Sequence, residues 1–178
     1  MYKINLYGPP SVGKSMQSAL VFGKLKLKGI NAELIGEAAK ELFWLGCDLK
    51  AGGELLQLEI FVSQLKKEEG ISGVDFLVTD SPLLLNAYYS KSELTRQIAE
   101  GKLKKNDLHF WLTRSNAKFE KEGRVHNEEE SRQIEEEMKR YLNNSGVNLI
   151  VVDCAIEDRA DWIINYSLNH KAEAEISK

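Results

Sequence analysis

Apolar and polar positions follow two periods along the chain, one typical of β-strands and one typical of helices. Short apolar or alternating segments predict five strands, at residues 2–7, 30–35, 74–80, 108–113 and 147–152. Between the strands, apolar residues recur every three or four positions and predict helices, at residues 14–29, 38–44, 54–69, 82–104 with a break near 88–91, 127 onward, and 156–169. Strands that alternate with helices in this way predict an α/β fold, in which helices cover both faces of a parallel sheet.

The segment between the first predicted strand and the first predicted helix carries the clearest motif. Residues 8–15 read Gly-Pro-Pro-Ser-Val-Gly-Lys-Ser, which matches the phosphate-binding loop G-x-x-x-x-G-K-[ST]. Its glycines let the backbone wrap around a polyphosphate. Lys14 can then reach the β- and γ-phosphates, and the Ser15 hydroxyl can bind Mg²⁺. The strand before the loop and the helix after it favour this function over a glycine-rich turn that only opens a helix. The sequence therefore predicts ATP and Mg²⁺ as ligands, bound by Gly8, Ser11, Val12, Gly13, Lys14, Ser15 and Met16.

Ligands of a parallel sheet bind at the carboxyl ends of its strands. Residues from four predicted strands fall at this edge: Gly8, Glu37, Asp80 and Arg114. Asp80 ends the third predicted strand, where its carboxylate can hold Mg²⁺ directly or through water. The alternative is an aspartate that caps the next helix. Ser81 and Pro82 fit the start of that helix, with Ser81 as the N-cap.

The predicted helix at residues 54–69 offers a surface for a planar base. Gln57, Phe61 and Gln64 share one face and present two amides and an aromatic ring. A pair of glutamines on a solvated flank is the alternative. The other side of this helix is expected to pack against the protein through Leu55, Leu58, Val62 and Leu65.

Composition is typical of a soluble globular protein. The chain has 178 residues, 43% of them hydrophobic, and its net charge of −3 gives no basic field for nucleic acid. No apolar stretch of about 18 residues is present to cross a membrane. Cys47 and Cys154 have no zinc-ligand spacing with the histidines, so we expect reduced thiols and a cytoplasmic protein.

We expect residues 1–170 to form one domain, followed by a frayed polar tail at 171–178. Residues 115–127 follow neither the strand period nor the helix period, and they carry Lys118, Lys121 and Arg124. This segment is expected to be a basic, lid-like insertion.

These motifs resemble those of the small P-loop kinases that phosphorylate nucleosides and nucleotides, and more narrowly a phage-type, AAA-type family of kinase-like proteins. The resemblance extends over nearly the whole chain and depends on residues 8–15, Glu37, Asp80-Ser81-Pro82 and Gly123-Arg124-Val125-His126. It implies a P-loop NTPase fold with strand order 2-3-1-4-5, phosphoryl transfer from ATP and, for a phage protein, a location in the host cytoplasm. Thymidylate kinases have Asp-Arg where this chain has Asp80-Ser81, which argues against a thymidylate acceptor.

The resemblance also implies roles for individual residues. Glu37 would accept the proton of the attacking hydroxyl, with a solvated glutamate in the first turn of a helix as the alternative. Arg124 resembles the lid arginines that close over the transferred phosphate, with Arg114 or Arg132 behind it. Ordinary surface arginines are the alternative. The candidate catalytic residues are thus Lys14, Glu37, Asp80 and Arg124, and Ser15 and Asp80 are the candidate metal ligands. The candidate acceptor-binding residues are Glu37, Gln57, Phe61, Gln64 and Arg114.

The leading hypothesis is an ATP- and Mg²⁺-dependent kinase that acts on a nucleoside, a nucleotide or a related small molecule. One alternative is a phage-type DNA kinase that phosphorylates a modified base or an end in DNA. The other is a nucleotide-binding switch that is non-catalytic or hydrolyses ATP slowly. We expect a small-molecule partner, no membrane association, and a monomer or homodimer; nucleic acid is possible but not favoured.

Overall fold

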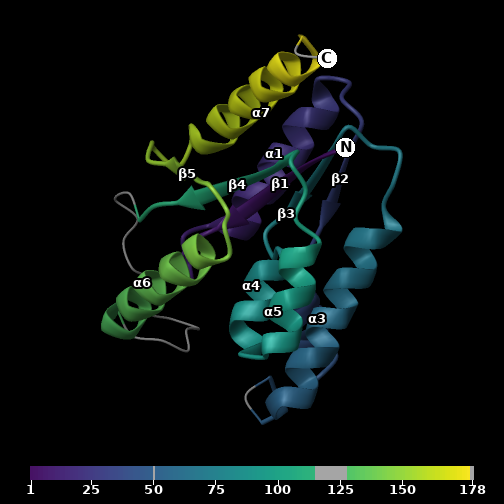
Figure 1. Cartoon of the computed structure of the whole chain (residues 1–178). Helices are drawn as coiled ribbons and strands as arrows, with labels where there is room; N and C mark the ends of the chain where they lie inside the picture. Colours follow the sequence, from purple (N-terminus) through teal and green to yellow (C-terminus); the bar gives the residue numbers. More distant parts are fainter. Residues whose placement is uncertain (50, 115–127, 177–178) are drawn as a thin grey trace.

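The computed structural model describes residues 1–49, 51–114 and 128–176 (Figure 1). Its strands form one parallel sheet in the order β2-β3-β1-β4-β5, which confirms the predicted order. In the central strand, Ile4 lies opposite Val78 on one side and Leu108 on the other. The strands are β1 (Tyr2–Tyr7), β2 (Ala32–Ile35), β3 (Phe76–Thr79), β4 (Asp107–Leu112) and β5 (Leu149–Val152).

Helices cover both faces of the sheet, and each face has its own apolar core (Figure 1). The described helices are α1 (Lys14–Leu27), α2 (Ala38–Trp44), α3 (Gly53–Gly70), α4 (Leu83–Ser90), α5 (Glu93–Gly101), α6 (Glu128–Asn144) and α7 (Arg159–Ile176). Helices α1 and α7 pack on one face, and α3, α4, α5 and α6 pack on the other. Successive side chains of β4 point to opposite faces of the sheet, so Phe110 belongs to the first core and Trp111 to the second.

The packing face predicted for α3 is wrong at three of its four positions. Leu55, Leu58 and Val62 are exposed, whereas Phe61 and Gln64 are buried. Apolar residues occur on both sides of this helix, so their spacing does not determine which side faces the core. The buried face of the helix also carries two polar side chains that bind other segments: the Gln64 Oε1 accepts from the Ala38 N–H at 3.2 Å, and Glu68 pairs with Lys3 at 2.7 Å.

Two helix ends also differ from the prediction. Pro82, not Ser81, occupies the N-cap position of α4, and the Ser81 hydroxyl instead accepts a hydrogen bond from Asn86 at 3.1 Å. The last helix ends later than predicted, because α7 continues through Ile176 instead of ending at residue 169. Lys171 Nζ lies 2.6 Å from Asp75 Oδ1, and this ion pair ties the end of α7 to the segment before β3.

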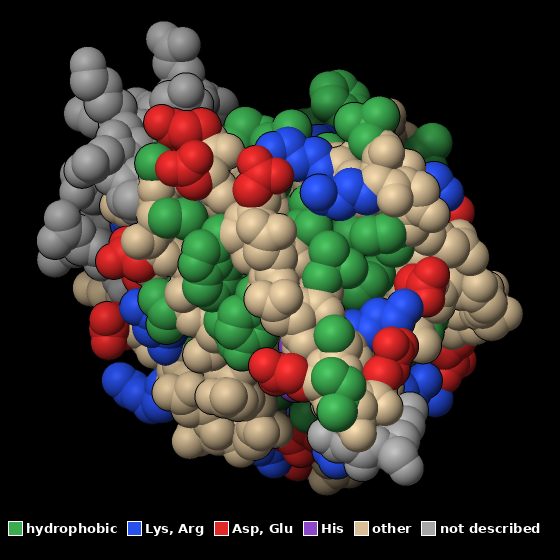
Figure 2. Space-filling model, turned by 90° about the horizontal axis from the view of Figure 1, so that it is seen from above, with side chains coloured by type: hydrophobic (Ala, Val, Ile, Leu, Met, Phe, Trp, Pro, Cys, Tyr) green, Lys and Arg blue, Asp and Glu red, His purple; other side chains and the backbone are tan. Residues whose placement is uncertain are grey.

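The surface mixes charges of both signs. On the face in Figure 2, the described lysine and arginine side chains are interspersed with acidic and apolar ones and form no continuous basic field. Among the described residues, no helix is both long and apolar enough to span a bilayer.

Candidate active site

The loop between β1 and α1 depends on backbone conformations that favour glycine. Gly8 has φ 147° and Gly13 has φ 90°. A Cβ at Gly8 would also lie 2.8 Å from both Leu112 O and Val12 Cγ1. Gly8 is therefore required by close packing as well as by its backbone, and Gly13 by its backbone alone. The resulting turn lets α1 begin directly at Lys14.

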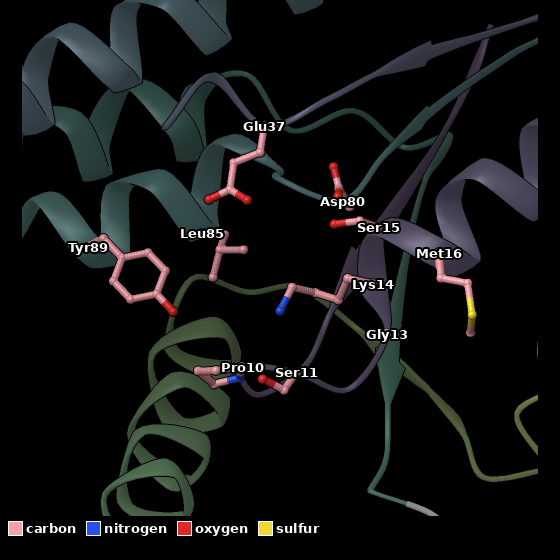
Figure 3. Close-up of a pocket in the computed structure, with 10 residues that line it drawn as sticks. All are labelled: Pro10, Ser11, Gly13, Lys14, Ser15, Met16, Glu37, Asp80, Leu85 and Tyr89. Atoms are coloured by element: carbon pink, nitrogen blue, oxygen red, sulfur yellow. The ribbon is translucent and has the colours of Figure 1, made fainter. Parts of the chain in front are cut away.

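The loop forms one wall of a cavity of about 340 Å³ at the carboxyl edge of the sheet (Figure 3). We call it the phosphate-loop cavity. The segment after β2 contributes Glu37, the segment after β3 contributes Asp80, and α4 contributes the remaining wall. Its lining residues are Pro10, Ser11, Gly13, Lys14, Ser15, Met16, Glu37, Asp80, Leu85 and Tyr89.

Lys14 places a cation in this cavity. Its Nζ donates to the main-chain oxygens of Gly8 at 2.9 Å and Pro9 at 3.2 Å, so the side chain folds back along its own loop. Burial lowers the pKa of Lys14, and the negative charges of Glu37 and Asp80 oppose that shift. The ammonium thus lies in a partly desolvated site where an anion would interact with it strongly.

Glu37 faces Lys14 from the other side of the cavity (Figure 3). Glu37 is exposed to solvent, but surrounding protein removes part of its hydration. This burial is the largest cause of a raised pKa, and the Asp80 charge adds to it, while Lys14 and Lys40 act in the opposite direction. A carboxylate with a raised pKa is a better proton acceptor than an ordinary glutamate.

Asp80 and Ser15 are the residues that fit a metal ion. Asp80 is 6% exposed, and its buried Oδ1 has no hydrogen-bond partner in the described part of the chain. A buried carboxylate oxygen without a donor is costly unless something binds it. The Ser15 hydroxyl lines the same cavity and adds a second oxygen ligand. No group of three or more His, Cys, Asp or Glu side chains that could hold a metal occurs within residues 1–49, 51–114 and 128–176. A pair of oxygens suits Mg²⁺, which takes few protein ligands and completes its shell with water and substrate phosphates.

Two buried side chains hold the phosphate loop against neighbouring segments. Arg159, at the start of α7, is 1% exposed and donates to Val12 O at 3.3 Å and Thr113 O at 2.7 Å. Gln17 in α1 is fully buried, and its Nε2 donates to Ile156 O at 2.8 Å. These bonds join the loop, the end of β4 and the segment after β5. No local pattern in the sequence indicates a role for either residue, because their importance depends on contacts between distant segments.

The predicted nucleotide-binding residues fall into two groups. Five of them line the cavity: Ser11, Gly13, Lys14, Ser15 and Met16. Gly8 contributes its carbonyl to Lys14. Val12 is buried in the core beside α1 and α7, so it supports the loop from behind.

The predicted acceptor-binding residues are not brought together. Glu37 lines the cavity, but Gln57, Phe61 and Gln64 do not. Phe61 is 1% exposed within the core beneath α4, and Gln64 is fully buried between α2 and the end of β3. Arg114 lies outside the lining and its Nε donates to Glu135 of α6 at 3.0 Å. Arg124 and the insertion at 115–127 lie outside the described residues.

Leu85 and Tyr89 of α4 line the cavity but were not among the predicted site residues. They are four residues apart in the helix that follows Asp80, so their side chains lie on the same face of that helix. This spacing could have revealed them. The sequence predicts only a helix break near residues 88–91, and that break is confirmed, because α4 ends at Ser90 and Lys91 has φ 53°.

Comparisons with solved structures support the fold. Deoxyadenosine kinase from M. mycoides with bound dATP is 19% identical, with a TM-score of 0.60, and the match covers 95% of this chain and 100% of that one. The YorR protein from Bacillus subtilis, in complex with phosphorylated GDP, is 22% identical, with a TM-score of 0.60 and coverage of 95% and 98%. Shikimate kinase from Acinetobacter baumannii in complex with shikimate is 12% identical, with a TM-score of 0.59 and coverage of 96% and 95%. At these identities the likeness shows the fold alone. No curated protein matches significantly.

A family model described as an AAA domain matches residues 3–159. That range contains the phosphate loop, Glu37 and Asp80. It ends at Arg159, which donates a hydrogen bond to the carbonyl of Val12 in the loop. The chain therefore belongs to this AAA-domain family, and it shares its fold with small P-loop kinases.

Proposed function

We propose that this protein is an ATP- and Mg²⁺-dependent kinase that phosphorylates a hydroxyl or phosphate group of a nucleoside, a nucleotide or a related small molecule. The observation that carries the proposal is the meeting of Lys14, Glu37 and Asp80 at one cavity, from three separate segments. Together they supply a cation for phosphate, a base for a proton and a carboxylate for a metal ion.

Lys14 binds the transferred phosphate in this proposal. Its ammonium donates to neutral carbonyl oxygens of the loop, and a phosphate oxygen is a stronger acceptor because it is charged. The partial desolvation of the lysine strengthens that attraction. Lys14 thereby neutralises charge on the phosphate as transfer proceeds.

Glu37 accepts the proton of the acceptor hydroxyl. Its raised pKa makes it a stronger proton acceptor than an ordinary glutamate. The lowered pKa of Lys14 and the raised pKa of Glu37 both follow from partial enclosure of the cavity. Exclusion of water also protects the phosphate from hydrolysis.

Ser15 and Asp80 would hold Mg²⁺ together with phosphate oxygens of ATP. The bound ion supplies positive charge that offsets the phosphate charges and orients them for transfer. The buried Asp80 Oδ1 supports this assignment over a helix-capping aspartate, because α4 has no side-chain cap.

Arg124 is proposed to cover the transferred phosphate from the insertion at residues 115–127. Arg124→Ala should lower kcat by about 10²-fold while changing the Kd for ATP much less, because it acts on charge that develops during transfer. Steady-state kinetics and calorimetric ATP titration provide the two values. Equal losses in kcat and in affinity for ATP, or no loss in either, would indicate that Arg124 is an ordinary surface arginine.

The first test follows the label from γ-labelled ATP in a pool of nucleosides, nucleotides, single-stranded DNA and duplex DNA. We expect label in the small-molecule fraction, in the presence of Mg²⁺ only. Lys14→Ala should abolish it, and Lys26→Ala, on an exposed position of the same helix, should not. Failure of the wild type to transfer label, with native folding and bound ATP, contradicts the proposal.

The same experiment distinguishes the alternatives. Label in DNA, with binding that weakens steeply as salt rises, would identify a DNA kinase. Free phosphate with no labelled acceptor would identify a slow ATPase or switch.

A further inference from the structure

A second cavity, of about 520 Å³, adjoins the phosphate-loop cavity. It lies between the end of α4, the start of α5 and α6, which cover the same face of the sheet (Figure 1). This volume falls within the range of small-molecule sites. We call it the tyrosine pocket, and the residues that matter most here are Tyr88, Tyr89, Arg96, Ile134, Glu137 and Tyr141.

Aromatic rings form the walls of the tyrosine pocket. The ring centroids of Tyr88 and Tyr141 are 5.5 Å apart, and those of Tyr88 and Tyr89 are 5.2 Å apart. Ile134 adds an aliphatic surface from α6. Rings at steep angles to one another offer both faces and edges to a flat ligand, so this lining suits a planar ring.

Polar groups at the pocket are balanced in charge. Arg96 makes a two-pronged hydrogen bond to Glu93, from Nε to Oε2 at 2.9 Å and from Nη2 to Oε1 at 2.7 Å. Glu137 accepts a hydrogen bond from the Tyr88 hydroxyl at 3.4 Å. With Lys91, the lining contains two cations, Lys91 and Arg96, and two carboxylates, Glu93 and Glu137. A neutral ring that carries N–H donors and acceptors matches this lining better than an anion does. The phosphate-loop cavity, in contrast, suits an anion, because Lys14 places a cation there.

Tyr89 joins the two cavities, because it lines both. Figure 3 shows its hydroxyl end directed into the phosphate-loop cavity, on the side of Lys14 and Pro10. A ligand whose ring lies among the tyrosines would reach Lys14 and Glu37 by extending past Tyr89. A flat base at one end and a hydroxyl or phosphate at the other is the chemistry of a nucleoside or nucleotide.

We propose that the tyrosine pocket binds the planar base of the phosphate acceptor, and that the acceptor is a nucleoside or nucleotide and not a non-aromatic alcohol. This proposal rests on the kinase function proposed above and moves acceptor recognition from α3, where the sequence pointed, to α4 and α6. Gln64 and Phe61 keep a structural role because they are buried elsewhere.

The test fills the pocket without touching the phosphate loop. Ile134→Trp places a bulky ring in the space proposed for the base, and Val151→Trp, on the exposed edge strand β5, is the matched control. Initial rates are measured with the common ribo- and deoxyribonucleosides and their monophosphates, and with shikimate as a non-aromatic hydroxyl acceptor. The melting temperature with and without Mg²⁺-ATP reports folding and nucleotide binding separately.

We expect the wild type to phosphorylate at least one acceptor that contains a base, and shikimate not at all. Ile134→Trp should raise the KM for that acceptor by about tenfold or more, as steric exclusion from a fitted pocket does, with the KM for ATP and the ATP-induced melting shift unchanged. Val151→Trp should match the wild type. An unchanged acceptor KM in folded Ile134→Trp, or preference for shikimate, overturns the proposal.

Two further measurements separate this proposal from the kinase function. If Ile134→Trp does not fold, Glu137→Gln keeps the shape of the pocket and should raise acceptor KM severalfold, and no change would count against the pocket. If the wild type binds ATP but transfers no phosphate, equilibrium dialysis of the labelled nucleosides against wild type and Ile134→Trp tests the pocket directly. Nucleoside binding that Ile134→Trp weakens supports the pocket, and binding that is absent or unaffected overturns it.

Discussion

The two cavities that share Tyr89 are built in different ways. The phosphate-loop cavity depends on backbone: two glycines with positive φ, carbonyls that hold Lys14, and strand ends that deliver Glu37 and Asp80. The tyrosine pocket depends on side chains that three helices bring together. A loop that recognises phosphate through its backbone tolerates little change and leaves a readable motif. A pocket of side chains from separate helices can vary from protein to protein, so it suits recognition of a particular acceptor.

The largest effect expected from this difference is at Lys14. Lys14→Ala should lower kcat/KM by about 10³-fold or more, because it removes a charge that faces the transferred phosphate. The fold should persist, since the hydrogen bonds that Lys14 makes within the described residues go to its own loop. Steady-state kinetics and circular dichroism measure the two outcomes. A small loss of turnover would mean that the phosphate-loop cavity is not the catalytic one.

Glu37 should give the next largest effect and a change in pH dependence. Glu37→Gln should lower kcat by about 10²-fold, as loss of a general base does. A general base acts in its ionised form, so in the proposed mechanism activity should fall as pH drops through the raised pKa of Glu37, with a limb centred above 4.5, the ordinary value for glutamate. In Glu37→Gln this limb should disappear. Glu33→Gln, on an exposed position of β2, should retain both the rate and the limb.

Arg159 links the phosphate loop to the rest of the fold, so its loss should affect stability and nucleotide affinity together. Arg159→Met leaves the buried carbonyl of Val12 and the partly buried carbonyl of Thr113 without this donor, which should cost about 2 kcal/mol of unfolding free energy. A melting temperature lower by about 4–8 °C corresponds to that loss. The KM for ATP should rise while the KM for the acceptor stays close to normal.

Arg159→Lys sharpens this test, because a lysine can restore a hydrogen bond from its single nitrogen but not the geometry of two guanidinium nitrogens that donate to two carbonyls. Partial recovery of the ATP KM is expected from a positioning role. A variant with lowered stability and unchanged ATP KM would show that Arg159 only supports the fold.

The smallest effect should come from a single hydroxyl in the tyrosine pocket. Tyr88→Phe removes the donor to Glu137 at 3.4 Å but keeps the ring. A long hydrogen bond at a partly exposed site contributes little, so the acceptor KM should rise by about two- to fivefold. The ATP KM should not move. Tyr166→Phe on α7, on the opposite face of the sheet, is the control for loss of a tyrosine hydroxyl.

The sequence alone determined the sheet and the phosphate loop. Periodicity located all five strands, because alternating or continuous apolar segments are local signals, and the resemblance implied their order, which the structure confirms. The motif at residues 8–15 specified the loop for the same reason: a G-x-x-x-x-G-K-S segment encodes its own backbone conformation. Because parallel strands end at a common edge, Glu37 and Asp80 could be assigned to the site before their contacts were known, and both line the cavity.

Only the tertiary structure determined the rest of the site. Gln64 was a candidate ligand for a base, but it is fully buried and its Oε1 accepts a hydrogen bond from the Ala38 N–H. Tyr89 looked like a helix end, yet it lines both cavities. Arg159 lies 147 residues from Val12 in the chain and reaches its carbonyl only in the folded protein. Local patterns specify which elements form, whereas helix rotation and contacts between distant segments depend on the energy of the whole packed chain.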